Sequence, residues 1–93
     1  MKYQNLGSVI DQLLKNLGIE DQVLEHQAVA FWDEIAGNNI SKNTKAIRIE
    51  DGVLFVRVTS DAWKNELLFY KPELIQKLNE KIGKNIVRDI YLV

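Results

Sequence analysis

The segment 45–58, KAIRIEDGVLFVRV, constrains the fold more than any other part of the chain. Apolar and polar side chains alternate on either side of Asp51-Gly52. Such alternation is typical of strands with one buried face, and Asp-Gly between two alternating runs favours a tight hairpin turn. We therefore expect two antiparallel strands joined at this dipeptide. The residues expected on the buried face are Ile47, Ile49, Leu54, Val56 and Val58.

Two amphipathic helices are predicted before the hairpin. Apolar residues between 6 and 17 recur at the spacing of one helical face, and Gly18 follows them where a left-handed end residue is expected. A second helix is predicted from about Glu20 to Ala36, and Gly37 ends it. We expect one further helical turn around Ile40. The apolar stripe of the second helix consists of Leu24, Ala28, Phe31, Trp32 and Ile35.

Helical periodicity returns after the hairpin, interrupted by the chain's single proline. Ser60 or Asp61 is expected to cap this helical region. Pro72 cannot donate a hydrogen bond to the carbonyl of Leu68, so we expect two helices that meet near Tyr70–Pro72, with a single kinked helix as the alternative. The predicted core stripe, in which Trp63 is expected to be buried, consists of Trp63, Leu67, Tyr70, Leu74 and Leu78.

Phe69 projects away from this stripe by the same helical spacing. It either plugs the bend at Pro72 or faces solvent as an anchor for a binding partner. Under the second interpretation, Lys64 and Lys71 are the polar neighbours that complete a partner-binding site with Phe69.

Gly83 is expected to end the last helix, and IVRDIYLV then predicts a third strand beside the hairpin. The complete order is α-α-β-β-α-α-β, with helices packed on a small three-stranded sheet. This is a two-layer α+β arrangement, similar in outline to a type II K-homology domain. The length of 93 residues fits one domain over residues 1–93. The order of strands in the sheet does not follow from the pattern.

The composition argues against most enzymes. Cysteine is absent and His26 is the only histidine, so a cluster of soft metal ligands is not expected. Phosphate-binding glycine loops and nucleophile motifs are also absent. We expect no cofactor, no metal and no small-molecule substrate. No apolar run is long enough to span a membrane, and the chain is expected to be cytoplasmic.

Two basic groups are the candidates for nucleic-acid contact. Lysines near a helix end also favour the helix dipole, and charged residues often only solvate a surface. Because the net charge is −1, we expect DNA binding to be weak, non-specific and sensitive to salt. The first group, around the hairpin, is Lys42, Lys45, Arg48 and Arg57, and the second, along and after the last helix, is Lys77, Lys81, Lys84 and Arg88.

Nucleic-acid-binding K-homology domains clamp the phosphate backbone with a GXXG loop between paired helices. The corresponding joint here, Phe69–Pro72, has no glycine, so that mode of binding is expected to be disabled. Phe55 and Tyr91 are expected on the outer face of the sheet. They form either a partner patch or a surface that the N-terminal helices cover.

Several segments, in their order and spacing, resemble the DciA family. They are Leu6–Ile10 with Leu17-Gly18, Phe31–Gly37, Thr44–Ile47, Asp51–Val58, Ser60–Leu67 and Lys71–Leu74. The resemblance implies a K-homology-like domain of the bacterial cytoplasm that interacts with the replicative DnaB-type helicase and helps to place it on DNA. Family members also contact DNA, and many carry an additional flexible and basic segment, which we do not expect in this chain.

The family's recurrent tryptophan and the Glu-Leu that follows it map to Trp63, Glu66 and Leu67. We interpret the chain as a non-enzymatic interaction domain that acts as a helicase loader or accessory in DNA replication. The alternatives are a K-homology-like nucleic-acid-binding module without the GXXG clamp, and a small structural subunit of a larger assembly.

Overall fold

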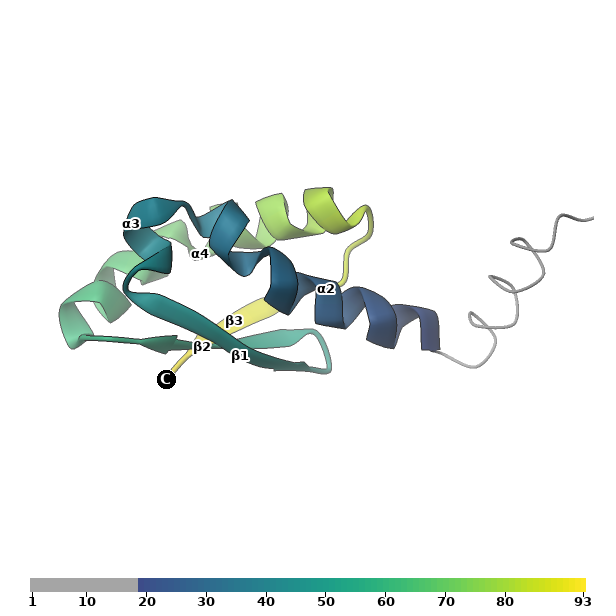
Figure 1. The fold of residues 1–93 in the computed structure, drawn as a ribbon, viewed down its shortest axis with the longest axis horizontal. Coiled ribbons are helices and arrows are strands. Elements are labelled where there is room, and N and C mark those ends of the chain that lie inside the picture. Colours follow the sequence, from purple (N-terminus) through teal and green to yellow (C-terminus); the bar gives the residue numbers. More distant parts are fainter. Residues whose placement is uncertain (1–18) are drawn as a thin grey trace, which may run out of the picture.

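The computed structural model describes residues 19–93, and the helix predicted over 6–17 lies outside the described residues. Helices α2 and α4 lie on the same side of a three-stranded sheet (Figure 1). The expected α+β arrangement is therefore confirmed. The described elements are α2 (Ile19–Ala36), α3 (Asn38–Ser41), β1 (Thr44–Glu50), β2 (Val53–Val58), α4 (Asp61–Ile82) and β3 (Asp89–Leu92).

The hairpin forms at the predicted turn. Asp51 and Gly52 both have positive φ values, 49° and 80°, as a two-residue hairpin turn of the primed type requires. Gly52 also joins three parts of the fold: its N–H donates to Glu25 Oε2 on α2 at 3.0 Å, and its carbonyl accepts from Arg88 N at 2.8 Å. A Cβ added at Gly52 would meet Ile86 O at 3.0 Å, so glycine suits both the conformation and the close approach.

Strand order in the sheet is β1-β2-β3, so the third strand lies beside the hairpin as expected. β1 and β2 are antiparallel, whereas β2 and β3 are parallel and α4 makes the crossover between them. An irregularity in β1 between Ala46 and Arg48 shifts the register by one residue. Ala46, and not the expected Ile47, therefore packs against the core together with Ile49.

Trp32 lies in the centre of the core, with 1% of its surface exposed. Its indole Nε1 donates to Thr44 Oγ1 at 2.9 Å, and this hydroxyl donates in turn to Ile40 O at 2.7 Å. The predicted inner faces of α2 and β2 are confirmed, because Ala28 and Trp32 of α2 and Leu54 and Val56 of β2 are buried. The core cluster consists of Ala28, Trp32, Leu54, Val56, Leu67, Leu74, Leu78, Val87 and Ile90.

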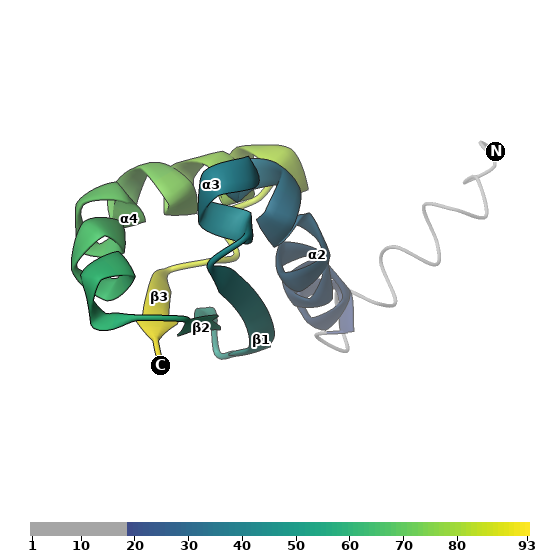
Figure 2. The same cartoon turned by 60° about the vertical axis from the view of Figure 1, so that its left-hand side comes forward.

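The region 61–82 is a single continuous helix, so the expectation of two helices was wrong and its alternative holds. Ser60 caps α4 by accepting from Trp63 N at 3.3 Å, and Gly83 ends it with a φ of 91°. Pro72 is exposed, and α4 bends around the core in Figure 2. A helix that curves with its convex side toward water tolerates a proline on that side, because water can solvate the carbonyl that loses its donor.

The predicted core stripe of α4 is correct at its three leucines and wrong at Trp63 and Tyr70. Leu67, Leu74 and Leu78 are buried, but Trp63 is only half-buried and Tyr70 is 41% exposed. Helical spacing gives only the direction of a side chain. The first turns of α4 face a hollow beside α3, where no other side chain of residues 19–93 completes the packing around these two rings.

A side-chain amide of α4 positions the connection to β3. Asn79 Oδ1 accepts from Ile86 N at 3.0 Å and from Val87 N at 2.8 Å, while Asn79 Nδ2 donates to Val87 O at 2.8 Å. These bonds satisfy backbone groups that have no strand partner, so the connection enters β3 in a fixed direction. The inward positions of β3 are Ile90 and Leu92, as predicted, but Val87 is also buried.

Asp89, at the start of β3, is held by two neighbours. Partial burial alone would raise the pKa of its carboxyl group. The hydrogen bond from Ile90 N at 2.8 Å and the ion pair with Lys71 at 3.2 Å, with Arg88 nearby, outweigh this effect. The pKa of Asp89 is therefore lowered from its ordinary value of 3.8.

Replacing the central indole should destabilise the fold far more than replacing the half-buried one. We expect Trp32→Ala to lower the free energy of unfolding by about 3–5 kcal/mol, because it leaves a cavity and removes the donor to Thr44. Trp63→Ala should cost clearly less. Urea denaturation of both variants measures the difference, and an equal or larger loss for Trp63→Ala would contradict the assignment of the core.

The ion pair at Asp89 predicts a dependence on pH. A carboxyl group with a lowered pKa stabilises the folded chain above the pKa of the unfolded state and loses that contribution as pH falls through the folded-state value. Asp89→Asn should therefore be less stable than the unchanged chain at about pH 7, by at most ~1 kcal/mol because the pair is exposed. The difference should disappear near pH 2. Thermal melts at both pH values test this, and a difference that persists in acid would argue against the electrostatic origin.

Candidate partner-binding site

An open groove lies between the end of α2, the short helix α3 and the first turns of α4. It has a volume of about 650 Å³. Trp63 and Tyr70 supply its aromatic surface, and Glu66 lies between them on the same helix. The lining residues are Ala36, Gly37, Asn38, Asn39, Ile40, Ala62, Trp63, Glu66 and Tyr70.

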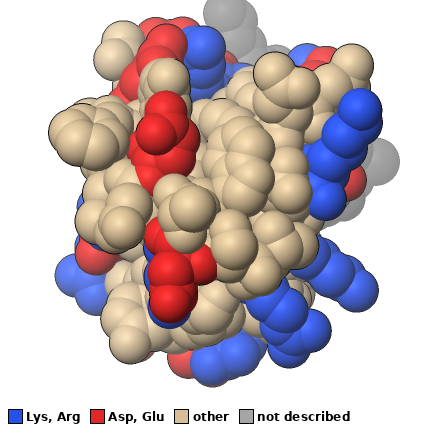
Figure 3. All heavy atoms as spheres, turned by 90° about the vertical axis from the view of Figure 1, so that its left-hand side faces the viewer, with Lys and Arg blue, Asp and Glu red and all other residues tan. Residues whose placement is uncertain are grey.

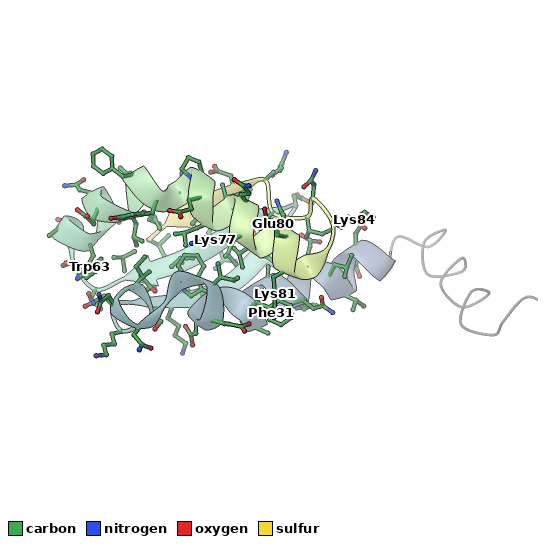
Figure 4. The ribbon with its side chains drawn as sticks, turned by 90° about the horizontal axis from the view of Figure 1, so that it is seen from above. Phe31, Trp63, Lys77, Glu80, Lys81 and Lys84 are labelled. Atoms are coloured by element: carbon green, nitrogen blue, oxygen red, sulfur yellow. The ribbon has the colours of Figure 1, made fainter. Side chains whose placement is uncertain are left out.

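The groove follows from how α2 ends. Gly37 has a φ of 84°, which breaks the helix and turns the chain into α3. A Cβ at Gly37 would meet no atom within 4 Å, so this corner of the groove is open. Thr44, bonded to both Trp32 and Ile40, fixes α3 against the start of β1. Trp63 lies near the start of α4, at the opposite end of this helix from Lys84 (Figure 4).

Phe69 is the most exposed large apolar residue of the described chain, at 83%. It does not plug the bend, so that interpretation is wrong. Its neighbours at helical spacings of three and four residues are Asn65, Glu66, Pro72 and Glu73, and the lysines expected beside it are not among them. Figure 3 shows this end of the molecule, where acidic side chains form a column next to a broad uncharged surface.

Lys64 and Lys71 lie on a different side of α4. With Leu68 and Tyr91 they line a shallow hollow between α4 and β3. Lys71 forms the ion pair with Asp89 and is half-buried. The structure therefore brings the two lysines together but separates them from Phe69, because residues 64, 68 and 71 share one helical face and residue 69 does not.

The four basic residues of the second group all have partners within the fold. Lys77 pairs with Glu73 at 3.2 Å on α4. Lys81 and Lys84 pair with Glu34 and Asp21 of α2, at 3.5 and 2.7 Å. Lys81 Nζ also lies 5.5 Å from the ring centre of Phe31, and Figure 4 shows both residues together. Arg88 Nε donates to Asp51 O at 2.6 Å.

The first basic group lies mostly on the outer face of the sheet. Arg48 forms an ion pair with Glu50 at 3.3 Å, and its guanidinium lies 4.2 Å from the ring centre of Phe55. Lys45 and Arg57 are direct partners across β1 and β2. Lys42, the C-terminal cap of α3, is exposed and precedes β1.

The expected pairing of Phe55 with Tyr91 is present, with ring centres 5.6 Å apart and planes inclined at 59°. The cover expected from the N-terminal helices is not provided by α2, which packs on the inner face of the sheet. The helix predicted over 6–17 lies outside the described residues. Within 19–93, all helices lie on the other side of the sheet (Figure 1).

Sequence reasoning missed the groove. The sequence signals of the groove were the helix end at Gly37 and the two aromatic residues of α4, Trp63 and Tyr70, and both aromatics were assigned to the core.

Within residues 19–93, no three histidine, cysteine or acidic side chains gather as metal ligands would. None of the helices in this part of the chain combines the length and the apolar character that a membrane span needs.

Comparison with known proteins identifies relatives over nearly the whole chain. A protein of Streptomyces coelicolor named UPF0232 is 34% identical and covers 91% of this chain, and a UPF0232 protein of Corynebacterium glutamicum is 28% identical and covers 94%. A third, from Mycobacterium tuberculosis, is 29% identical and also covers 94%.

The aligned part of the chain spans about half the length of these relatives, at 46%, 49% and 46% of each. The family described as "Dna[CI] antecedent, DciA" matches residues 5–92. This match covers all described elements from α2 to β3. The chain therefore belongs to the DciA family.

Proposed function

We propose that the chain is a non-enzymatic interaction domain of the bacterial cytoplasm that contacts a DnaB-type replicative helicase and acts as its loader or accessory. Membership of the DciA family supports the class of partner. The observation that carries the proposal is the aromatic groove, which the half-buried Trp63 and the 41% exposed Tyr70 line, with the 83% exposed Phe69 next to Tyr70 on α4. Tryptophan and tyrosine are among the residues that most often dominate the binding energy at protein interfaces.

The groove suits an apolar side chain from a partner helix or loop. Its walls are apolar at Ala36, Ile40 and Ala62, and its aromatic rings are rigid, so little conformational entropy is lost when they are covered. Glu66 in the lining, with Glu73 next to Phe69, favours a partner that carries basic residues beside its apolar anchor.

A binding role agrees better with the groove than a catalytic role does. Among residues 19–93, Glu66 is the only carboxylate in its lining, and no histidine, lysine or serine of this part of the chain lines the groove to form an acid–base or nucleophile–base pair with it. Of the three residues first proposed for partner binding, Phe69 stays in the site. Lys64 and Lys71 are better explained by the hollow against β3 and by the ion pair with Asp89.

Phe69→Ala and Tyr70→Ala should separate binding from stability. Both residues are exposed, so the melting temperature should be nearly unchanged. Each substitution should weaken binding to the purified helicase by at least about 2 kcal/mol, the scale of an interface hot spot. Tyr91→Ala is the matched control, because Tyr91 is also an exposed aromatic residue, 56% uncovered, but lies on the sheet and not in the groove.

Titration calorimetry of the helicase with the unchanged chain and with each of the three variants, accompanied by thermal melts, tests whether the groove is the helicase contact. If Phe69→Ala and Tyr70→Ala bind as tightly as the unchanged chain, or if Tyr91→Ala weakens binding equally, the groove and the adjacent Phe69 are not the helicase contact. A loss of stability in Phe69→Ala without a separable binding defect would remove Phe69 from the site.

A further inference from the structure

We propose that the hollow between α4 and β3 is a second docking surface, and that it binds an acidic protein segment with an apolar side chain between its carboxylates. This goes beyond the helicase contact, and the hollow shares no lining residue with the groove. Three features of the hollow carry the proposal: its uncovered apolar surface, the two lysines beside that surface, and the incomplete pairing of those lysines within the fold.

Both walls of the hollow carry uncovered apolar surface. Leu68 of α4 is 55% exposed and Tyr91 of β3 is 56% exposed, and both line the hollow. The buried Ile90 and the half-buried Leu92 line it from the strand. The hollow has a volume of about 290 Å³. An apolar side chain of a partner that entered it would remove this surface from water, which favours association.

Two cations flank the apolar side chain of α4. Lys64 lies four residues before Leu68 and Lys71 lies three residues after it, so the three side chains share one face of the helix. About two helical turns separate the lysines, which places them about 10 Å apart along the axis. Among residues 19–93, these lysines are the charged residues that line the hollow, and no carboxylate does so.

The charges of the two lysines are only partly matched within the fold. Lys71 pairs with Asp89 at 3.2 Å, but the side chain of Asp89 is 53% exposed, so a carboxylate of a partner can replace it. Within residues 19–93, no carboxylate lies within ion-pair distance of Lys64. A segment with a carboxylate on either side of an apolar residue is therefore complementary to this surface in both charge and polarity.

Charge also separates this surface from the groove. Glu66 is the carboxylate of the groove lining, so the groove favours a basic partner, whereas the lysines of the hollow favour an acidic one. The two sites lie on different flanks of the same helix. A partner suited to one site is therefore repelled by the other, which keeps the two contacts specific.

The hollow suits a protein better than a nucleic acid. A single strand of nucleic acid is bound along a track of cations, with its bases stacked on aromatic rings. Here the side chain between the two cations is the aliphatic Leu68, and one of the cations already has a partner in Asp89. Aliphatic surface of this kind matches a leucine, isoleucine or phenylalanine side chain of a protein.

The test uses the whole isotope-labelled chain and a synthetic, alanine-based helical peptide of about 15 residues. The peptide carries a central leucine with a glutamate on either side at helical spacing. Nuclear magnetic resonance titration should show saturable shifts of the amide groups around Leu68 and Tyr91 below ~2 mM peptide, the range of weak contacts. A peptide with lysines in place of the glutamates, and one with alanine in place of the leucine, should each bind about fivefold more weakly or worse.

Substitutions in the chain should change the affinity for the glutamate peptide in opposite directions. Leu68→Ala and Lys64→Glu should each weaken it about fivefold or more, because the first removes apolar surface and the second reverses a charge. Asp89→Asn should strengthen it about two- to fivefold, since it releases Lys71 for the peptide. Glu80→Gln is the matched control, because it also removes one negative charge but lies outside the hollow. Its affinity should stay within about twofold of the unchanged chain.

Thermal melts show that each variant is folded. The absence of shifts around the hollow at ~2 mM glutamate peptide overturns the proposal, and so does equally tight binding of the lysine peptide. A gain of affinity in Glu80→Gln as large as that in Asp89→Asn would trace the effect to net charge, and this result also overturns it.

Two further titrations keep the proposal distinct from the alternatives. If Leu68→Ala and Lys64→Glu weaken binding of the purified helicase as much as Phe69→Ala does, the hollow belongs to the helicase contact and is not a second surface. If they weaken binding of a labelled oligothymidylate while the glutamate peptide does not bind, the ligand is nucleic acid. Either result overturns the proposal, whereas failure of the groove variants in the helicase titration leaves the result for the hollow intact.

Discussion

The burial of one indole ring holds the two layers of this fold together. Trp32 is part of α2, packs into a cluster to which β2, α4 and β3 also contribute, and donates to the first residue of β1. The ring combines a large apolar surface with a single polar atom, and that atom needs a partner when it is buried. Thr44 meets this need and passes the hydrogen bond on to α3. The packing of the helices on the sheet and the position of α3 therefore depend on the same side chain.

One helix, α4, serves three surfaces at once. Its inner face supplies Leu67, Leu74 and Leu78 to the core. One flank carries Trp63 and Tyr70 into the groove, and the other carries Lys64 and Lys71 toward β3. The bend of α4 lets a helix of 22 residues, which contains Pro72, follow a small core without leaving it (Figure 2). The proposed binding residues are therefore fixed to a rigid element, and any change in this bend would move the groove and the β3 side together.

Local chemistry made the hairpin, α2 and the helix ends predictable. Asp51-Gly52, Ser60 and Gly83 each act through conformations or hydrogen bonds of their own segment, and the structure has them as expected. Trp63 and Pro72 were misjudged because the outcome depends on distant parts of the fold. Whether a residue on the inner stripe is covered depends on what lies opposite, and whether a proline breaks a helix depends on which side faces water.

The irregularity in β1 and the partners of the basic residues could not be predicted for the same reason, because both depend on distant parts of the fold. Alternation along 44–50 gives no sign that one residue is added to the ladder, and it therefore placed Ile47 inside. Lys81 and Lys84 meet carboxylates of α2 that are more than 40 residues away in sequence. Such pairs become visible only when the helices are placed side by side. For the candidate site, the sequence identified Phe69 correctly as unusual but gave it the wrong neighbours.

The two edges of the sheet restrict how this domain can associate with others. β1, one edge strand, carries an irregularity and the exposed Lys45, and β3, the other edge strand, has four residues. At the β3 edge, Asp89 Oδ1 already accepts from Ile90 N, one of the donors that an added strand would need. Such features make an edge a poor template for intermolecular β-sheet formation, and they protect small sheets from aggregation. Partners are thus directed away from backbone pairing and toward the side chains of the flat faces, where recognition depends on the identity of each residue.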